Sequence, residues 1–292
     1  MAIFGSSFTY NGISSDDYGI ILCAVTQPDS IPMGLKREII KGEITSNRSV
    51  ANWYNTKYSD VLSFDITITK PEDRAFSREE IRDINAWLTG PRTPALLFFE
   101  DEAFDPINYY GIFTDVTNTY GSGILMLTYT FTADSPYGWS NEREFKCTSQ
   151  SATSNIKFEI INDTDELTDF IYPLFKIKST PGTKITIENT SEISTDIKSC
   201  VFSFTFPSNL DSTLPIYIDS KYHRFYYKNN LGAKITLSLS DLGFTTNQLD
   251  NFDNGLLAMY WIRLIPGTNI LNVSGKCDIT ATFRCPRKVG AY

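Results

Sequence analysis

The sequence predicts a mainly β protein in two parts: an N-terminal β-sandwich-like domain with one α-helix and an extended arm, followed by an antiparallel β-sandwich. Three observations support this fold class. Strand-length segments with alternating apolar and polar residues recur along the chain, only one segment has convincing helical periodicity, and 292 residues exceed what one hydrophobic core usually organises. We place the first domain at residues 1–138, a linker at 139–150 and the second domain at 151–292.

The N-terminal domain begins with a hairpin signal. Asn11 and Gly12 separate two strand-like segments, and this pair favours a tight turn because both residues accept positive φ. Residues 62–69 alternate between apolar and polar side chains, which is typical of a half-buried strand. Buried strands are expected at 95–99 and 109–113, and a strand with alternating apolar and threonine residues at 125–132.

One helix is predicted between the strands at 62–69 and 95–99. Ser77 and Glu80 form a capping box, in which the serine oxygen accepts an unpaired backbone N–H and the glutamate reaches back. Glycine followed by proline, at Gly90 and Pro91, ends the helix. Its apolar face consists of Ile81, Ile84, Trp87 and Leu88.

Residues 27–60 lack a compact pattern and predict either an extended hairpin or a long loop that projects from the core. Long irregular excursions are usually functional or disordered. The aromatic residues Trp53, Tyr54 and Tyr58 favour an interface. We expect a turn at residues 134–138, where the strand pattern ends, and two more candidate interface residues, Tyr137 and Trp139, at this hinge.

The C-terminal half predicts short strands at the spacing of a sandwich, separated by turn residues. No helix pattern interrupts them, which favours an antiparallel β-sandwich. The expected strands are 156–161, 174–178, 184–188, 200–206, 216–218, 225–227, 234–239, 259–264, 270–273 and 277–284.

Composition disfavours several classes of function. The net charge of −8 argues against a nucleic-acid-binding protein, which would show a basic patch. Five cysteines without C-x-x-C spacing predict reduced, mostly buried thiols rather than disulfides or a zinc site. No apolar run is long enough to span a bilayer, and no signal peptide is visible, so we expect folding in a cytoplasm without membrane insertion.

No motif predicts catalysis, a cofactor or a metal. His223 is the sole histidine and is expected in a strand with a structural or surface role. The acidic residues at 100–102 and Asp105 could hold a divalent cation but match no EF-hand loop, so a solvated loop is favoured. Tyr222 and residues 225–227 suggest either a sugar platform or, more commonly, core and interface packing.

The order of these motifs resembles the distal tail protein (Dit) family of long-tailed, non-contractile bacteriophages. An opening run from Phe8 to Gly19 and a closing run over residues 134–138 bracket the N-terminal half, as in that family. Residues 160–163, 172–177 and 264–275 resemble the family's galectin-like sandwich. The resemblance therefore extends over nearly the whole chain.

The resemblance implies a structural virion protein at the tail tip, assembled in the host bacterial cytoplasm. Family members form a hexameric ring, in which an arm or belt grips the neighbouring subunit, and 27–60 is our candidate for this belt. The implied partners are further copies of the chain, the tail tube protein, the tail-associated tip or lysin protein, the tape measure protein, and receptor-binding or other baseplate proteins. DNA would only pass through the lumen.

Two alternatives come from other classes. The first is a carbohydrate-binding β-sandwich module that aids adsorption to the host cell wall through an exposed aromatic such as Tyr226. His223 and Trp261 do not form the sugar-binding pattern of galectins, so this property is not implied by the resemblance. The second is a glycosidase or other hydrolase, for which no carboxylate pair stands out among 34 acidic residues.

Overall fold

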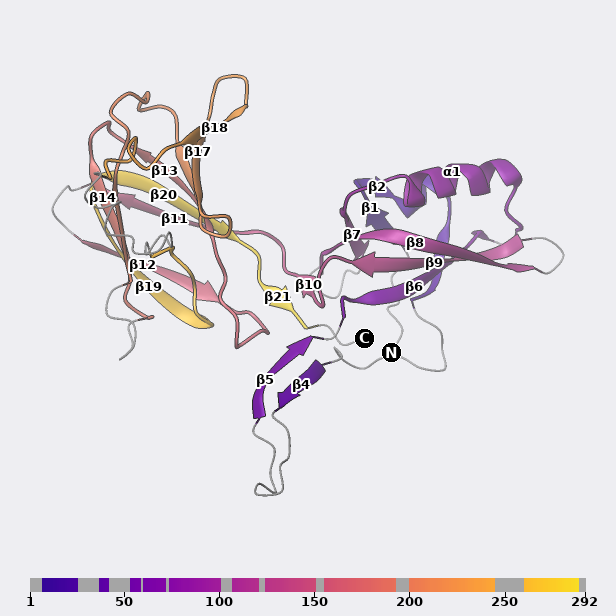
Figure 1. The fold of residues 1–292 in the computed structure, drawn as a ribbon. Coiled ribbons are helices and arrows are strands. Elements are labelled where there is room, and N and C mark those ends of the chain that lie inside the picture. The colour runs from indigo at the N-terminus through magenta and orange to yellow at the C-terminus, as the bar shows by residue number, and fades with distance from the viewer. Residues whose placement is uncertain are drawn as a thin grey trace, which may run out of the picture. The chain divides into compact units, whose positions relative to one another are not determined.

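The computed structural model describes residues 7–25, 37–41, 53–58, 60–71, 74–100, 107–120, 124–150, 155–192, 200–244 and 260–288. The chain divides into two compact units. The first unit comprises Met1–Asn141 together with Pro286–Tyr292, and the second comprises Glu142–Cys285. Both units are built mainly from antiparallel strands, as the sequence predicts (Figure 1).

A seven-stranded antiparallel sheet forms the body of the first unit, in the order β2-β1-β7-β8-β9-β6-β3. The contacts between β1 and β3, which lie near opposite ends of this order, show that the sheet curls back on itself and so gives the unit its sandwich-like character. The strands are β1 (Ser7–Tyr10), β2 (Ile13–Ser14), β3 (Ile21–Val25), β6 (Ser63–Thr69), β7 (Ala95–Glu100), β8 (Tyr109–Tyr120) and β9 (Ile124–Ala133).

The predicted hairpin at the start of the chain is confirmed. β1 pairs with β2, and the turn between them has positive φ at both Asn11 (52°) and Gly12 (79°). A short 3-10 helix, η1 (Ser15–Tyr18), follows and places the buried hydroxyl of Ser15 within 3.0 Å of the Phe8 backbone N–H, from which it accepts a hydrogen bond. The opening motif therefore folds as one local unit before the chain enters β3.

Helix α1 (Arg78–Thr89) covers the apolar face of the sheet, with Ile84, Trp87 and Leu88 buried (Figure 1). The capping box is confirmed, because Ser77 Oγ accepts from the Glu80 N–H and Glu80 accepts from the Ser77 N–H. The helix ends at Gly90, but this residue is right-handed (φ −67°) rather than left-handed. The helix ends here because the next residue, Pro91, has no N–H to continue the hydrogen-bond pattern.

The segment predicted as a projecting arm contains an extended hairpin. β4 (Arg37–Lys41) and β5 (Trp53–Tyr58) pair antiparallel with each other and form a separate two-stranded sheet. All five residues of β4 are exposed. We call this pair of strands the arm hairpin.

The chain returns to the first unit at its C-terminal end. β10 (Gly138–Trp139) pairs with β21 (Pro286–Arg287), so the segment after the second unit joins the residues before it. This return was not expected from the sequence, where all residues from 151 to 292 were assigned to the second domain. A two-residue strand containing a proline has too little alternation to be recognised.

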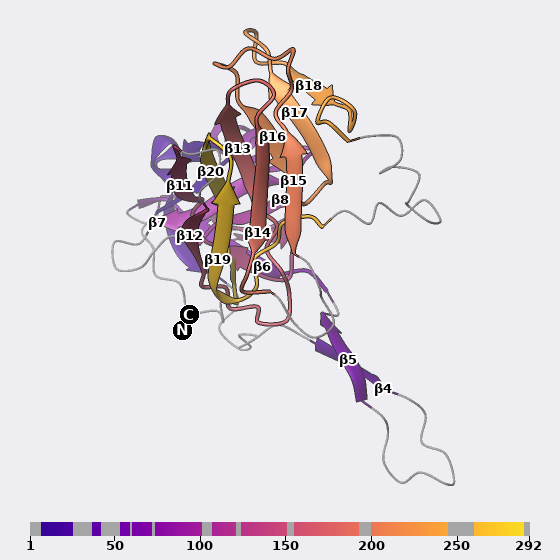
Figure 2. The ribbon, with the colours of Figure 1, turned by 90° about the vertical axis from the view of Figure 1, so that its left-hand side faces the viewer.

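The second unit is a sandwich of a six-stranded and a four-stranded antiparallel sheet (Figure 2). The six-stranded sheet has the order β11-β20-β13-β16-β17-β18, and the four-stranded sheet has the order β12-β19-β14-β15. Their bounds are β11 (Arg143–Ser149), β12 (Ile156–Asn162), β13 (Leu174–Ser179), β14 (Lys184–Asn189), β15 (Val201–Thr205), β16 (Ile216–Asp219), β17 (Arg224–Lys228), β18 (Lys234–Leu237), β19 (Gly267–Ser274) and β20 (Cys277–Phe283).

Two segments of the second unit differ from expectation. β11 occupies residues that were predicted as a linker. Its sequence lacks a clear strand pattern, because several outer positions are charged and the inner residues Phe145 and Cys147 are only partly buried. The predicted strand at 259–264 is absent among its described residues, where Leu264 forms only an isolated bridge with Ile171. The run is buried and apolar, but its carbonyl groups bond to asparagine side chains instead of to a strand.

Three fully buried asparagines hold this segment in place. Asn162 Nδ2 donates to the backbone oxygens of Leu264 (3.2 Å) and Ile265 (3.1 Å), and Asn189 Nδ2 donates to Asn269 Oδ1 (3.2 Å). Asn269 accepts from the Ile265 N–H at 2.9 Å and donates back to the Ile265 carbonyl at 2.8 Å. Two of the motifs on which the family resemblance depends, 160–163 and 264–275, therefore meet through their asparagines.

Candidate interface sites

The arm hairpin exposes apolar residues on both of its faces. Ile39 and Ile40 are 47% and 41% exposed, and adjacent residues of a strand point to opposite sides. Glu38 and Lys57 form an exposed ion pair at 3.1 Å across the two strands. A two-stranded ribbon is marginally stable alone in water, so a hairpin with this surface needs a further packing partner.

The base of the arm hairpin is tied to the hinge by aromatic contacts. The Tyr58 and Tyr137 rings meet edge to face at 6.0 Å, and Tyr137 meets Trp139 at 5.2 Å. Arg37 donates from Nη2 to Tyr58 Oη at 3.2 Å, and its guanidinium lies 5.2 Å from the centre of that ring. Three of the predicted interface residues are therefore brought together into one partly buried cluster.

Close backbone approach explains the glycine in the closing motif. A Cβ atom at Gly138 would lie 2.4 Å from the Ile107 side chain and 3.0 Å from Tyr109. Trp139 exchanges both backbone hydrogen bonds with Asn108, each at 2.8 Å, so the strand after the turn is clamped against residues preceding β8. The turn predicted at 134–138 is present as a bend over residues 134–137, and Gly138 begins β10.

The two other predicted interface residues are Trp53 and Tyr54, at the start of β5. Trp53 pairs with Lys41 through the backbone, beside an irregularity in the register of the arm hairpin. The side chains of Trp53 and Tyr54 lie outside the described part of the chain, as do Asp101, Glu102 and Asp105 of the acidic cluster.

The aromatic platform suggested for sugar binding is not an open surface. Tyr226 is only 5% exposed and Phe225 belongs to the core, whereas Tyr222 is 62% exposed. His223 is in a turn with φ +53°, not in a strand, and stacks 4.8 Å from the buried Trp261. The expectation that Tyr226 is exposed was wrong, because its outward ring is covered by neighbouring side chains.

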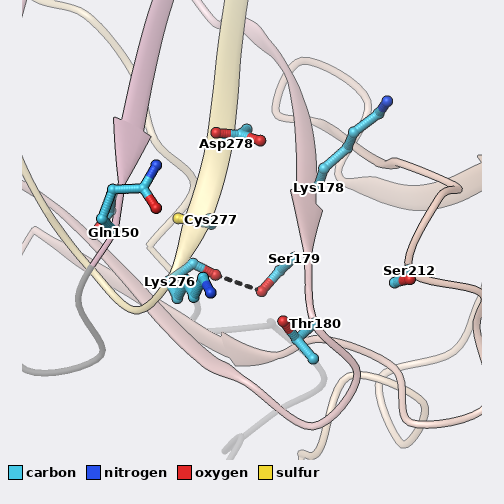
Figure 3. A pocket seen from close by; sticks show the side chains of 9 residues that line it. Gln150, Lys178, Ser179, Thr180, Ser212, Lys276, Cys277 and Asp278 are labelled. Atoms are coloured by element: carbon cyan, nitrogen blue, oxygen red, sulfur yellow. Dashed lines mark hydrogen bonds between the residues drawn. The ribbon is translucent and has the colours of Figure 1, made fainter.

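A depression lies at the end of the six-stranded sheet where β11, β13 and β20 meet (Figure 3). Ser179 Oγ donates to the Lys276 carbonyl at 2.7 Å, and the Lys178 side chain extends away from this pair (Figure 3). Burial raises the pKa of the Cys277 thiol to about 12, so the thiol is protonated at neutral pH and is a poor nucleophile.

The described ranges contain no candidate metal site and no candidate membrane-spanning helix. No three His, Cys, Asp or Glu residues of these ranges gather into a group that could hold a metal ion. Within the same ranges, no helix has the length and apolar character needed to cross a bilayer.

One surface of the second unit was missed by the sequence analysis. The β17–β18 hairpin presents Leu231, which is 92% exposed, at a turn between Lys228 and Lys234. The sequence contains a signal for this surface, because the turn Asn-Asn-Leu-Gly places an apolar residue where polar residues are usual.

The fold and these surfaces define a two-part β protein whose described candidate sites are interfaces. Two family models match the sequence: a phage tail protein N-terminal domain at residues 4–135 and a phage tail C-terminal domain at residues 137–205. Together the matches span more than half of the chain. The chain belongs to this family of phage tail proteins, which makes it a virion component. Comparison with curated proteins gives no match.

Solved phage structures match this chain. One is the Dit protein (gp 19.1) of phage SPP1, described as a paradigm of the hub adsorption apparatus of phages that infect Gram-positive bacteria. It is 17% identical, covers 95% of this chain and 98% of its own, and has a TM-score of 0.63. This similarity establishes a shared fold with a distal tail protein.

Another matching structure is the baseplate of phage p2 in its activated conformation with Sr. One of its chains is 12% identical and matches over 98% of this chain and 99% of its own length, with a TM-score of 0.49.

Proposed function

We propose that the chain forms a hexameric ring at the distal end of the tail, as the hub that joins the tail tube to the tail-tip protein and supports the components of host adsorption. The observation on which the proposal chiefly depends is the arm hairpin, a β-ribbon with two exposed isoleucines that pairs with no strand of the described core. A neighbouring subunit would supply the missing packing partner. A head-to-tail contact of this kind closes into a ring when the rotation is right.

The aromatic cluster at the base of the arm hairpin supports the same proposal. Tyr58, Tyr137 and Trp139 fix the strand end nearest the hinge, so the exposed ribbon leaves the unit from a defined point. Trp53 and Tyr54 are proposed as further contacts to the neighbour. The ribbon is then already ordered within its own subunit, so less conformational entropy is lost when it binds a neighbour.

Charge is consistent with a lumen that DNA traverses without binding. The first unit has 12 lysines and arginines against 18 aspartates and glutamates, a net charge of −6. A ring of six such units would repel a DNA backbone rather than hold it. The tail tube, tip or lysin, and tape measure proteins are the proposed axial partners, and receptor-binding or other baseplate proteins are proposed on the second unit.

Light scattering of the purified protein, with negative-stain imaging of the same fractions, tests the ring. We expect a particle of about 198 kDa, six times the chain mass of 33.0 kDa, and sixfold images. Replacing Ile39 and Ile40 by Asp should convert the ring to monomers. Replacing Met126, which is 42% exposed in β9, by Asp is the matched control and should leave the ring intact. Monomers that do not assemble even with tube and tip proteins would contradict the proposal.

A further inference from the structure

The β17–β18 hairpin ends in a rigid turn that displays an apolar side chain. Asn229 Oδ1 accepts from the backbone N–H groups of Leu231 (3.0 Å) and Ala233 (2.9 Å), and the Gly232 N–H donates to the Asn229 carbonyl at 2.8 Å. At its tip, Leu231 is the most exposed large hydrophobic residue in the described chain, at 92%. Figure 1 shows this turn extending beyond the strands at one end of the sandwich. The turn therefore holds an exposed leucine in a defined position.

Two lysines face each other across the hairpin directly below this turn. Lys228 and Lys234 are register partners, and like charges in directly opposite positions destabilise an antiparallel pair. Among the described residues, neither lysine forms an ion pair with an acid. The repulsion between the two facing lysines and the exposure of Leu231 both disfavour folding, and they occur together in one hairpin.

The lysines are supported by a pair of stacked tyrosines on the outer face of the sheet. The Tyr217 and Tyr226 rings are 5.0 Å apart and nearly parallel. Lys228 Nζ lies 5.2 Å from the centre of the Tyr217 ring, and Lys234 Nζ lies 5.0 Å from that of Tyr226. Each cation is attracted to the face of its ring, which orders the two ammonium groups while they stay solvated.

The positive charge extends along the neighbouring strands. Lys176 is exposed on β13 and is the register partner of Tyr217, so it lies on the same outer face. Arg224 is also on this face, but both its Nε and Nη2 donate to Asp219, at 2.9 and 2.8 Å, so its charge is neutralised locally. Three lysines consequently form a basic surface on a protein with a net charge of −8.

We propose that Leu231 and its flanking lysines are a docking knob for another protein of the virion, one with a small apolar pocket rimmed by carboxylates. The inference rests on the proposed function, in which tail components attach to the second unit. Charge complementarity and the exposed leucine select this partner. A wall sugar is disfavoured because Tyr226 is covered, and a phosphate polymer because it has no apolar pocket for the exposed Leu231.

Photocrosslinking in assembled phage particles tests this docking. A benzoylphenylalanine at position 231 should give an adduct with another tail polypeptide, at a site where acidic residues border an apolar pocket. The same residue at position 167 is the control, since Leu167 is 72% exposed on the second unit but lies outside the hairpin. No adduct at 231, an adduct with wall polymer, or equal adducts at both positions would overturn the proposal.

Charge variants separate docking from folding. Lys228→Glu creates an opposite-charge pair with Lys234, so it should keep or slightly raise the thermal stability while it lowers the adduct yield at 231. The double variant Lys228→Glu/Lys234→Glu should lower the yield about tenfold, because it places carboxylates against an acidic partner. An unchanged yield in the double variant would refute the role of charge.

The same variants distinguish this inference from the ring. Light scattering of the double variant should show the hexamer that the unaltered chain forms, since the hairpin is remote in sequence from the arm. A ring without an adduct at 231 would refute the docking knob alone. Monomers of the unaltered chain that do not assemble with tube and tip proteins would refute the ring, and the adduct at 231 would still test the docking.

Discussion

The first unit closes its core with a helix over an aromatic sheet, whereas the second closes its core between two sheets. In the first unit the rings of Phe8 and Tyr18 stack on either side of Trp87 from α1, at 5.6 and 4.6 Å. In the second unit the buried side chains include many isoleucines, and the chain segment beside them is held by asparagine amides.

The polar groups that organise each unit differ in location. In the first unit they lie at the helix start, where Lys70 Nζ is 3.2 Å from Glu80 and also donates to the Tyr18 carbonyl at 2.9 Å. In the second unit Asn162, Asn189 and Asn269 are fully buried. A buried amide that loses its hydrogen-bond partners destabilises the fold more than a surface amide does. Replacing a polar residue of these networks should therefore lower the unfolding free energy more in the second unit.

The largest effect is expected from Trp87→Ala. Trp87 is 6% exposed, stacks on two rings and donates from Nε1 to the Tyr10 carbonyl at 3.0 Å. We expect a loss of about 4 kcal/mol of unfolding free energy. Hydrogen exchange followed by mass spectrometry should show reduced protection in α1 and β1.

Two results would check this assignment. Trp87→Phe keeps a ring in the stack and loses only the N–H donor, so it should cost about 1 kcal/mol. Equal losses for the Ala and Phe variants would show that the hydrogen bond, rather than the ring packing, dominates. Loss of protection in β12 and β19 as well would contradict separate cores.

Asn269→Ala is the corresponding change in the second unit. It removes the acceptor of the Ile265 N–H and the donor to the Ile265 and Gly267 carbonyls, at 2.8 and 3.1 Å. The buried Asn189 amide also loses Asn269 Oδ1 as its acceptor, so we expect a cost of about 3 kcal/mol, measured by denaturant unfolding.

Asn272→Ala is the matched control for Asn269→Ala. Asn272 is on the same strand but on its outer side, and its amide donates to Glu188 at 3.2 Å. The control should cost less than about 1 kcal/mol, since the group that it leaves unpaired is partly solvated. A similar loss for both variants would argue against the importance of the buried network.

Local signals in the sequence predicted the elements that depend on neighbouring residues. The Asn11 and Gly12 turn, the Ser77 and Glu80 capping box and the alternation over residues 62–69 each depend on residues a few positions apart. Nine of the ten strands expected in the second unit are present for the same reason. Such patterns directly reflect backbone conformation and one-sided burial.

Features that depend on distant residues could not be predicted. The 259–264 segment has the apolar content of a strand, but its backbone partners are asparagines from β12 and β14. Tyr226 points outward and is still buried, because Tyr217, Arg224 and Lys234 cover it. The pairing of β21 with β10 likewise joins residues that are far apart in the chain.

A smaller effect is expected from pH at the helix start. The hydrogen bond from the Ser77 N–H, with help from Lys70 and Arg74, lowers the pKa of Glu80 to about 2. The ionised form is therefore favoured in the folded state, so its contribution is complete above the unfolded pKa near 4.5 and is lost as pH falls towards 2. Because the side chain is 27% exposed, we expect only about 1 kcal/mol.

Comparison of variants isolates this contribution from that of other carboxylates. Glu80→Gln should lose stability at pH 7 and show a weaker decrease between pH 4.5 and 2 than the unaltered protein, measured by denaturant unfolding. Glu79→Gln removes the same charge from the same helical turn without breaking the capping box. Identical pH profiles for the two variants would show that general charge, not the cap, is responsible.

The smallest effect is expected from chemical labelling of cysteines, which should distinguish the two units by the exposure of their thiols. Cys23 in the first unit is exposed, whereas Cys200, Cys277 and Cys285 in the second are buried. Burial also raises the pKa of Cys147, Cys200 and Cys277, which disfavours the reactive thiolate. Iodoacetamide at pH 8 should therefore modify Cys23 first, as read by peptide mass spectrometry. Labelling of Cys277 at the same rate in the native protein would contradict a closed second core, whereas labelling that appears only with Asn269→Ala would show that the asparagine network keeps this core closed.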